Sequence, residues 1–133
     1  SAVKTIDRIV DALPPEEREQ TKSFLSQSLL GVVTQFLVRT PDLRGRKAIC
    51  EVMVMTRAIG KLITSEQSHM IPSQVQTGRE AGMQTLDQAL LAAIQAREVD
   101  PEDAFGYAMD KKPFARYVPE GTAILKADVT QGL

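Results

Sequence analysis

The chain has 133 residues, 43% hydrophobic and 25% charged, with a formal net charge of −1 from 16 basic and 17 acidic side chains. This fits one soluble domain without an overall field that would recruit nucleic acid or an anionic membrane, and no apolar run approaches the roughly 20 residues that span a bilayer. A single cysteine, Cys50, excludes an internal disulfide and a four-cysteine zinc module and favours a reducing cytoplasm.

The first third of the chain predicts two helices. Residues 5–10 place Ile6, Ile9 and Val10 on one helical face, and the prolines that follow Leu13 end this helix. Pro15 suits the first position of a second, long amphipathic helix. The apolar stripe of this helix, at helical spacing, consists of Leu25, Leu29, Val32, Val33 and Phe36. At its last turn the chain becomes rich in β-branched residues, and we expect a strand to begin at about Gln35.

A β-hairpin is predicted next, because residues 41–45 combine proline, aspartate and glycine between two strand-like runs. Residues 47–55 are apolar on both faces, as in a strand buried on both sides of a larger sheet. Two strands alone are marginal in water. This favours the interpretation that the chain is a fragment, and it predicts self-association through an exposed strand near residues 49–54.

Helices follow the hairpin. Thr56 is a predicted N-cap for residues 57–63, with Ile59, Leu62 and Ile63 inward, although Gly60 costs about 1 kcal/mol relative to alanine. Ser65 is predicted to begin another helix, with Pro72 as a distortion inside it.

Residues 76–88 predict a rigid joint between helices. Gly78 is placed to end the preceding helix in the left-handed conformation, and Thr85 with Gln88 has the spacing of a capping box. Local chemistry alone indicates only that this segment fixes an angle between two helices.

Two more helices are predicted after the joint. The first, ending near Arg97, buries Leu86, Leu90, Ala93 and Ile94. The second has Asp100 as its cap, buries Ala104, Phe105, Ala108 and Met109, and ends at residues 111–113. Lys111, Lys112 and Arg116 lie near Phe114 and Tyr117, a pattern that fits either a nucleic-acid patch or, as the net charge favours, lysines at a helix end. Residues 119–133 predict a flexible tail.

The sequence contains no complete catalytic motif. It lacks the G-x-x-x-x-G-K-[ST] phosphate loop, the G-x-G-x-x-G fingerprint and the H-E-x-x-H zinc motif. His69 is the only histidine, and no further metal ligands stand near it, so we expect a surface or half-buried polar residue and no metal site. An independent small enzyme is therefore disfavoured.

Several segments, in collinear order over about residues 1–110, resemble the C-terminal part of the type IV pilus retraction ATPases, the PilT family within the type II/IV secretion ATPases. Residues 1–11 resemble the segment after the family's histidine box, residues 25–35 the helix that follows, and residues 45–54 its hairpin and core strand. Residues 56–63 stand at the family's A-I-R-N-L-I box. The family's Q-T-G and G-M-Q-T-L-D-Q motifs are matched by Gln76, Thr77, Gly78, Gly82, Met83, Gln84, Thr85, Leu86, Asp87 and Gln88.

The resemblance implies a mainly α fold with a small β-hairpin, namely the end of a RecA-like α/β ATPase domain over residues 1–55 and a C-terminal helical bundle over residues 56–118. It also implies a parent protein that is a hexamer, binds ATP and magnesium, and acts in the cytoplasm with the pilus machinery at the inner membrane. The family's phosphate loop, Walker B segment and histidine box have no counterpart among the 133 residues. We therefore expect this chain alone neither to bind nor to hydrolyse ATP.

The retraction role that the resemblance implies for the six-residue box carries over to Ala58, Ile59, Leu62 and Ile63. Gly60 and Lys61 replace the family's arginine and asparagine, which puts the arginine's contact in doubt. Core packing is the alternative role of the apolar positions. The competing functions are a pilus extension or type II secretion ATPase, disfavoured because those usually carry a four-cysteine zinc module, and a non-catalytic helical interaction module.

Overall fold

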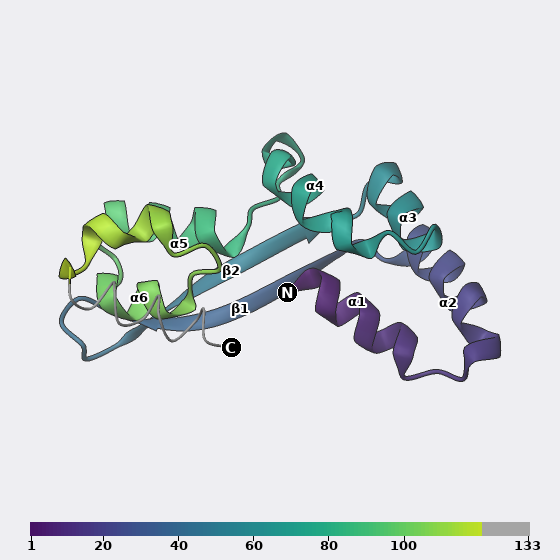
Figure 1. Ribbon diagram of the computed structural model, residues 1–133, viewed down its shortest axis with the longest axis horizontal. Helices are drawn as coiled ribbons and strands as arrows, with labels where there is room; N and C mark the ends of the chain where they lie inside the picture. The colour runs from purple at the N-terminus through teal and green to yellow at the C-terminus, as the bar shows by residue number, and fades with distance from the viewer. Residues whose placement is uncertain (121–133) are drawn as a thin grey trace. The chain divides into compact units, whose positions relative to one another are not determined.

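The computed structural model describes residues 1–120 and shows a mainly helical chain with one two-stranded antiparallel sheet, which confirms the predicted fold class (Figure 1). The predicted tail lies outside the described residues from residue 121 onward. In chain order the elements are α1 (Ala2–Asp11), α2 (Pro15–Ser28), β1 (Gly31–Arg39), β2 (Arg46–Val54), α3 (Arg57–Thr64), the 3-10 helix η1 (Ser68–Met70), α4 (Ile71–Thr77), η2 (Arg79–Ala81), α5 (Leu86–Gln95), α6 (Pro101–Tyr107) and η3 (Lys112–Tyr117).

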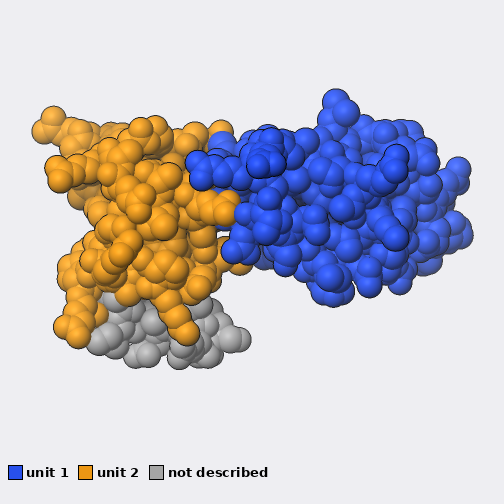
Figure 2. Space-filling view, turned by 90° about the horizontal axis from the view of Figure 1, so that it is seen from above, with its two compact units in different colours: residues 1–34, 50–85 blue, residues 35–49, 86–133 orange. Residues whose placement is uncertain are grey.

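Two compact units share the two strands (Figure 2). Unit 1 consists of residues 1–34 and 50–85, and unit 2 consists of residues 35–49 together with the chain from residue 86 onward. Each unit has a core of its own. The buried side chains that pack together in the core of unit 1 are Ala2, Ile6, Met53, Ile59, Ile63, Ile71, Val75 and Met83. Those of unit 2 are Val38, Ile49, Leu86, Leu90, Ala93, Ile94, Val99, Ala104, Phe105, Ala108, Phe114 and Val118. The domain boundaries predicted at residues 55 and 118 stay predictions.

The hairpin forms as predicted, but its first strand begins earlier than expected. The Met55 N–H donates to the Leu30 carbonyl and the Thr40 N–H donates to the Gly45 carbonyl, which fixes an antiparallel register along both strands. The second helix ends at Ser28, so the predicted helical stripe from Val32 to Phe36 is wrong. Those β-branched and aromatic residues adopt the extended conformation because it buries alternate side chains.

Ile49 and Met53, in the strand expected to be exposed, are buried instead. The exposed strand is β1, where Val33 and Leu37 are 65% and 47% exposed. These two residues lie on the outward face of the strand, whereas Val38 of the opposite parity is buried. The apolar surface available to a partner therefore lies on β1 and not on β2.

Three helix predictions are corrected by the structure. Pro72 stands in the first turn of α4, where its missing N–H costs no hydrogen bond, and residues 68–77 form η1 and a short helix instead of one distorted helix that begins at Ser65. Ile9 of α1 is 42% exposed although Ile6 and Val10 are buried. In the last helix Met109 is 76% exposed, because α6 ends at Tyr107, before residues 111–113 are reached.

Candidate functional site

The six-residue box lies on α3 in unit 1, and only part of it is buried. Thr56 caps the helix as predicted, since its Oγ1 accepts the Ile59 N–H at 3.2 Å. Ile59 and Ile63 are buried in the unit 1 core, while Ala58 and Lys61 are exposed. Core packing thus explains the two isoleucines, and the exposed pair is available for contact with a partner.

Gly60 is buried on the side of α3 that faces α2. A Cβ atom added to Gly60 would lie 3.3 Å from the Ser26 carbonyl oxygen and 3.4 Å from the Ser26 Cβ atom. This close approach explains a glycine inside a helix that would otherwise gain stability from alanine. In this chain the position expected to carry the family's arginine therefore has no room for a long side chain without movement of α2.

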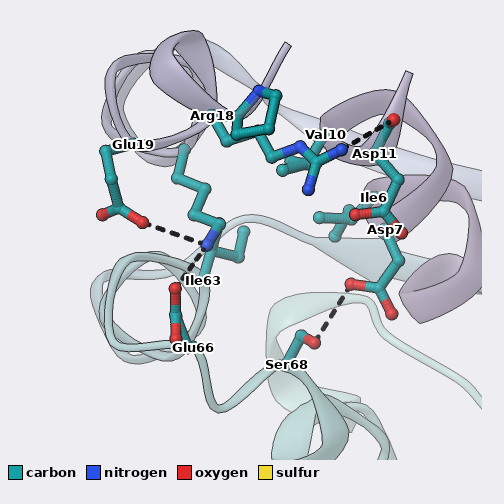
Figure 3. Close-up of a pocket in the computed structure, with 11 residues that line it drawn as sticks. Ile6, Asp7, Val10, Asp11, Arg18, Glu19, Ile63, Glu66 and Ser68 are labelled. Carbon is teal, nitrogen blue, oxygen red and sulfur yellow. Dashed lines mark hydrogen bonds and ion pairs between the residues drawn. The ribbon is translucent and has the colours of Figure 1, made fainter. Parts of the chain in front are cut away.

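The loop after α3 is tied to the first two helices by polar contacts (Figure 3). The Lys22 Nζ atom lies 3.0 Å from Glu66 Oε1 and 3.3 Å from Glu19 Oε1, and the Lys22 side chain is only 16% exposed. Ser68 Oγ donates to Asp7 Oδ1 at 3.1 Å. Glu66 itself has a left-handed backbone conformation, with φ of 59°, that a non-glycine residue seldom adopts.

The ion pair changes the acidity of both partners. The hydrogen bond to Glu66 raises the pKa of Lys22 above its ordinary value, Glu19 adds to this effect, and desolvation opposes it. The hydrogen bond from Lys22, followed by its positive charge, lowers the pKa of Glu66. Both groups are therefore charged at neutral pH and hold the loop against α2.

A cavity of about 410 Å³ opens among these helices. Its apolar wall is made by Ile6, Val10 and Ile63, and its polar rim includes Asp7, Asp11, Arg18, Glu19 and Glu66 (Figure 3). The Arg18 guanidinium donates to the Asp11 and Leu13 carbonyls at the end of α1. Those carbonyls would otherwise lack partners at the helix C-terminus, so the role of Arg18 is structural.

The glycines of the joint act differently from the prediction. Gly78 has φ of −90°, so the left-handed conformation expected there is wrong. A Cβ atom at Gly78 would lie 2.7 Å from Met83 Cε and 2.8 Å from the Gln74 carbonyl, so close packing requires this glycine. The left-handed residue is Gly82, with φ of 91°, which turns the chain after η2. Thr85 immediately precedes α5, the place that the predicted capping box requires.

The joint also pairs with the sheet, which was not predicted. Gln84 forms an antiparallel bridge with Val52, through two backbone hydrogen bonds of 2.9 and 3.0 Å. The Gln84 Nε2 atom donates to the Cys50 carbonyl at 2.7 Å. The segment that the sequence indicates as a helix-to-helix joint is therefore anchored to the outer edge of β2. A single bridge leaves no alternating pattern in the sequence that could have revealed it.

Glu51 is a further residue that sequence reasoning missed. Its Oε1 atom accepts the Ala2 N–H at 2.8 Å. The first turn of α1 has no acidic residue of its own, so Glu51 supplies from β2 the negative charge that the positive end of the helix favours. The signal was a lone acidic residue in the apolar run that follows Lys47 in β2.

The remaining candidates do not form a chemical site. His69 is exposed in η1, as expected, and Cys50 is half-buried with a free thiol. Lys111 donates to the Phe105 and Ala108 carbonyls at 3.0 Å, which favours its interpretation as a helix-end cation over a nucleic-acid contact. Within residues 1–120, no three histidine, cysteine or acidic side chains gather at a metal-binding distance, and no helix is long and apolar enough to cross a membrane.

Comparisons with known sequences and structures show which proteins this chain is similar to. No model of a protein family matches the sequence. The fold matches a crystal structure of the pilus retraction motor PilT with bound ADP at a TM-score of 0.72 and 30% identity, over 86% of this chain and 32% of that one. The fold and its hairpin are therefore those of part of a pilus ATPase.

The curated relatives agree. The chain is 42% identical over 103 residues to a twitching motility protein of Neisseria gonorrhoeae and 41% identical over 104 residues to the type IV pilus retraction ATPase PilT of Pseudomonas aeruginosa, covering 77% and 78% of this chain. It is 33% identical to the type IV pilus ATPase PilU of the same species over all of this chain. It spans 28% to 36% of the length of these relatives. The chain is homologous to the PilT and PilU type IV pilus ATPases over this part of their length.

Proposed function

We propose that this chain is the C-terminal part of a hexameric, ATP-driven motor that retracts type IV pili and so powers twitching motility. The observation that carries the proposal is 41% identity to a retraction ATPase across 78% of the chain, together with the match to the structure of a retraction motor. The partners of such a motor are further copies of itself and the pilus machinery at the inner membrane, on its cytoplasmic side.

Within this motor, the exposed side of α3 contacts a neighbouring element and couples the nucleotide state to movement. The proposal is supported by the division of the box, in which Ile59 and Ile63 hold the helix in unit 1 while Ala58 and Lys61 remain exposed. Since Gly60 is packed against Ser26, Lys61 is the charged residue of the box that remains for such a contact.

The nucleotide belongs to the rest of the motor. ATP and magnesium require a phosphate cradle and a carboxylate that holds the metal, and the 133 residues contain no phosphate loop. We therefore expect an isothermal titration to detect no binding of ATP by the isolated chain. Micromolar affinity there would contradict this part of the proposal without touching the retraction role.

The role of the exposed side of α3 in retraction is tested by Lys61→Ala in the full-length protein, with Lys112→Ala as the matched control because Lys112 is also exposed but lies in unit 2. Pilus retraction, observed with labelled pili, is expected to slow or stop for Lys61→Ala while ATP hydrolysis and thermal stability stay near the original values. Lys112→Ala should retract normally. Normal retraction by Lys61→Ala would contradict the role of the exposed side of α3.

A further inference from the structure

The helix α3 ends in a turn that favours glycine. The Gln67 N–H donates to the Leu62 carbonyl at 2.9 Å, which is the hydrogen bond that closes a Schellman motif. Glu66 occupies the left-handed position of that motif, with φ of 59°. Glycine is preferred there, because a Cβ atom crowds the backbone in this conformation. Glu66 therefore gives up stability that a glycine would supply, which points to a separate role for its side chain.

The Glu66 side chain joins the end of α3 to α2. Its Oε1 atom lies 3.0 Å from Lys22 Nζ, and Glu19 approaches the same nitrogen at 3.3 Å (Figure 3). The Lys22 side chain is only 16% exposed, so this pair is shielded in part from the water that weakens ion pairs at a surface. Earlier in α3, Gly60 packs closely against Ser26 of α2. The α3 helix is thus fixed to α2 at two points, one by close packing and one by charge.

The charged attachment is linked directly to the exposed side of α3. The Lys61 carbonyl accepts the Ser65 N–H at 3.0 Å and the Ser65 hydroxyl at 2.7 Å. These bonds connect the backbone of Lys61 to the turn that carries Glu66. A shift of Glu66 on α2 therefore shifts the backbone from which the exposed Lys61 side chain extends.

We propose that Glu66 is a positioning residue of the motor, which through its pair with Lys22 fixes the exposed side of α3 so that Lys61 transmits movement to a neighbouring element. The inference rests on the proposed function, which gives Lys61 that contact. A helix that could shift on α2 would absorb the movement instead of transmitting it. Glycine would stabilise the turn but has no side chain for the attachment, which accounts for a glutamate in this position.

Glu66→Gly in the full-length protein separates this role from a structural one. The melting temperature should stay the same or rise, because glycine suits the left-handed conformation. ATP hydrolysis should stay near the original rate, whereas the retraction of labelled pili should slow about threefold or more. Arg97→Gly is the matched control and should retract normally. Arg97, with φ of 58°, has the same place in the Schellman motif that ends α5 in unit 2.

Reversal of the two charges gives a second test. Lys22→Glu alone brings a third carboxylate to Glu19 and Glu66 and should slow retraction. The double variant, Lys22→Glu with Glu66→Lys, again sets one cation between two carboxylates and should restore retraction. Lysine fits the left-handed conformation no better than glutamate, so such a rescue comes from the restored pair and not from a relaxed turn.

Hydrogen exchange in the full-length protein measures the attachment without reference to retraction. The amides of Ser65 and Gln67 should exchange faster in Lys22→Glu than in the original protein and return to the original rate in the double variant. Unchanged exchange would overturn the proposal, and so would normal retraction by Glu66→Gly in a motor that Lys61→Ala slows. Normal retraction by Lys61→Ala would instead contradict the proposed function of α3, and the exchange rates would still decide whether Glu66 fixes the helix.

Discussion

Unit 1 and unit 2 differ in how their polar groups are paired and in how much of the β1 edge is covered. Unit 2 closes its part of β1 with α6, and Lys47 pairs with Glu98 at 2.7 Å. Asp87 accepts the backbone N–H groups of Met109 and Asp110. Unit 1 leaves its part of the edge open and carries both the cavity and the half-exposed box. The difference shows that the open part of the strand edge and the cavity both belong to unit 1, although unit 2 also exposes apolar side chains at Leu43 and Met109.

The largest expected effect comes from truncating a large buried side chain in either core. Phe105 of unit 2 and Ile59 of unit 1 are both fully buried, so Phe105→Ala should cost about 3–5 kcal/mol and Ile59→Ala about 2–5 kcal/mol of folding free energy. Hydrogen exchange should reveal the loss of protection first in the unit that carries the substitution. Equal loss across both units for either variant would break the distinction between them.

Smaller effects are expected from replacing two glycines, one packed against a neighbouring helix and one with open space around it. Gly60→Arg should cost about 1–3 kcal/mol, because the added atoms meet Ser26 of α2. Gly106→Ala in α6 meets nothing within 4 Å and should instead stabilise by about 0.5–1 kcal/mol, the gain in helix propensity. Thermal or urea unfolding measures both. A stable Gly60→Arg variant would mean that α2 and α3 are not packed as described.

Asp87 tests what holds the turn after α6 in unit 2. Both its carboxylate oxygens accept backbone N–H groups after α6, at 2.8 Å from Met109 and 2.9 Å from Asp110. Asp87→Ala should cost about 1–2 kcal/mol, since it leaves two donors without their acceptor. Asp87→Asn keeps one acceptor and should cost about half as much in the same urea titration. A loss for Asn equal to that for Ala would indicate that charge, and not the number of acceptors, holds the turn.

The smallest effect is a dependence on pH in unit 1. Because the pKa of Glu66 is lowered in the folded state, its pairing with Lys22 stabilises the chain above the ordinary carboxyl pKa of about 4.3 and is lost as the pH falls through the lowered value. Because the pKa of Lys22 is raised in the folded state, the ammonium contributes its full stabilisation below its ordinary pKa of 10.5 and loses it only as the pH rises through the raised value.

Thermal unfolding against pH checks this pair. Glu66→Gln should lower the melting temperature slightly at neutral pH and match the original chain in acid. Glu80→Gln, an exposed position in η2, is the control for the loss of one negative charge. Identical curves for Glu66→Gln and the original chain at all pH values would show that the pair holds nothing in place.

Features set by local chemistry were predictable from the sequence. The caps at Thr56 and Asp100, the first-turn position of Pro15 and the hairpin turn are all where the residues indicated. Likewise the buried face of α5 follows directly from helical spacing. In each case the deciding interaction lies within a few residues, so the sequence pattern contains the information.

Features set by distant residues were not predictable. Val32 fits a helix by spacing and becomes part of a strand because β2 is there to pair with it. The bridge from Gln84 to Val52 and the bond from Ala2 to Glu51 join residues far apart in the chain. Gly78 needs no left-handed backbone and is a glycine because Met83 packs against it. Tertiary contacts decided each of these over local preference.

The central claim, a role in pilus retraction, is tested most directly in cells that lack the gene for the full-length protein. Counting surface pili and measuring twitching separates retraction from extension. The account predicts more surface pili than in the parent strain and a loss of twitching, both restored by the original gene. Cells without pili would identify an extension motor, and unchanged piliation and movement would contradict a role in the pilus machine.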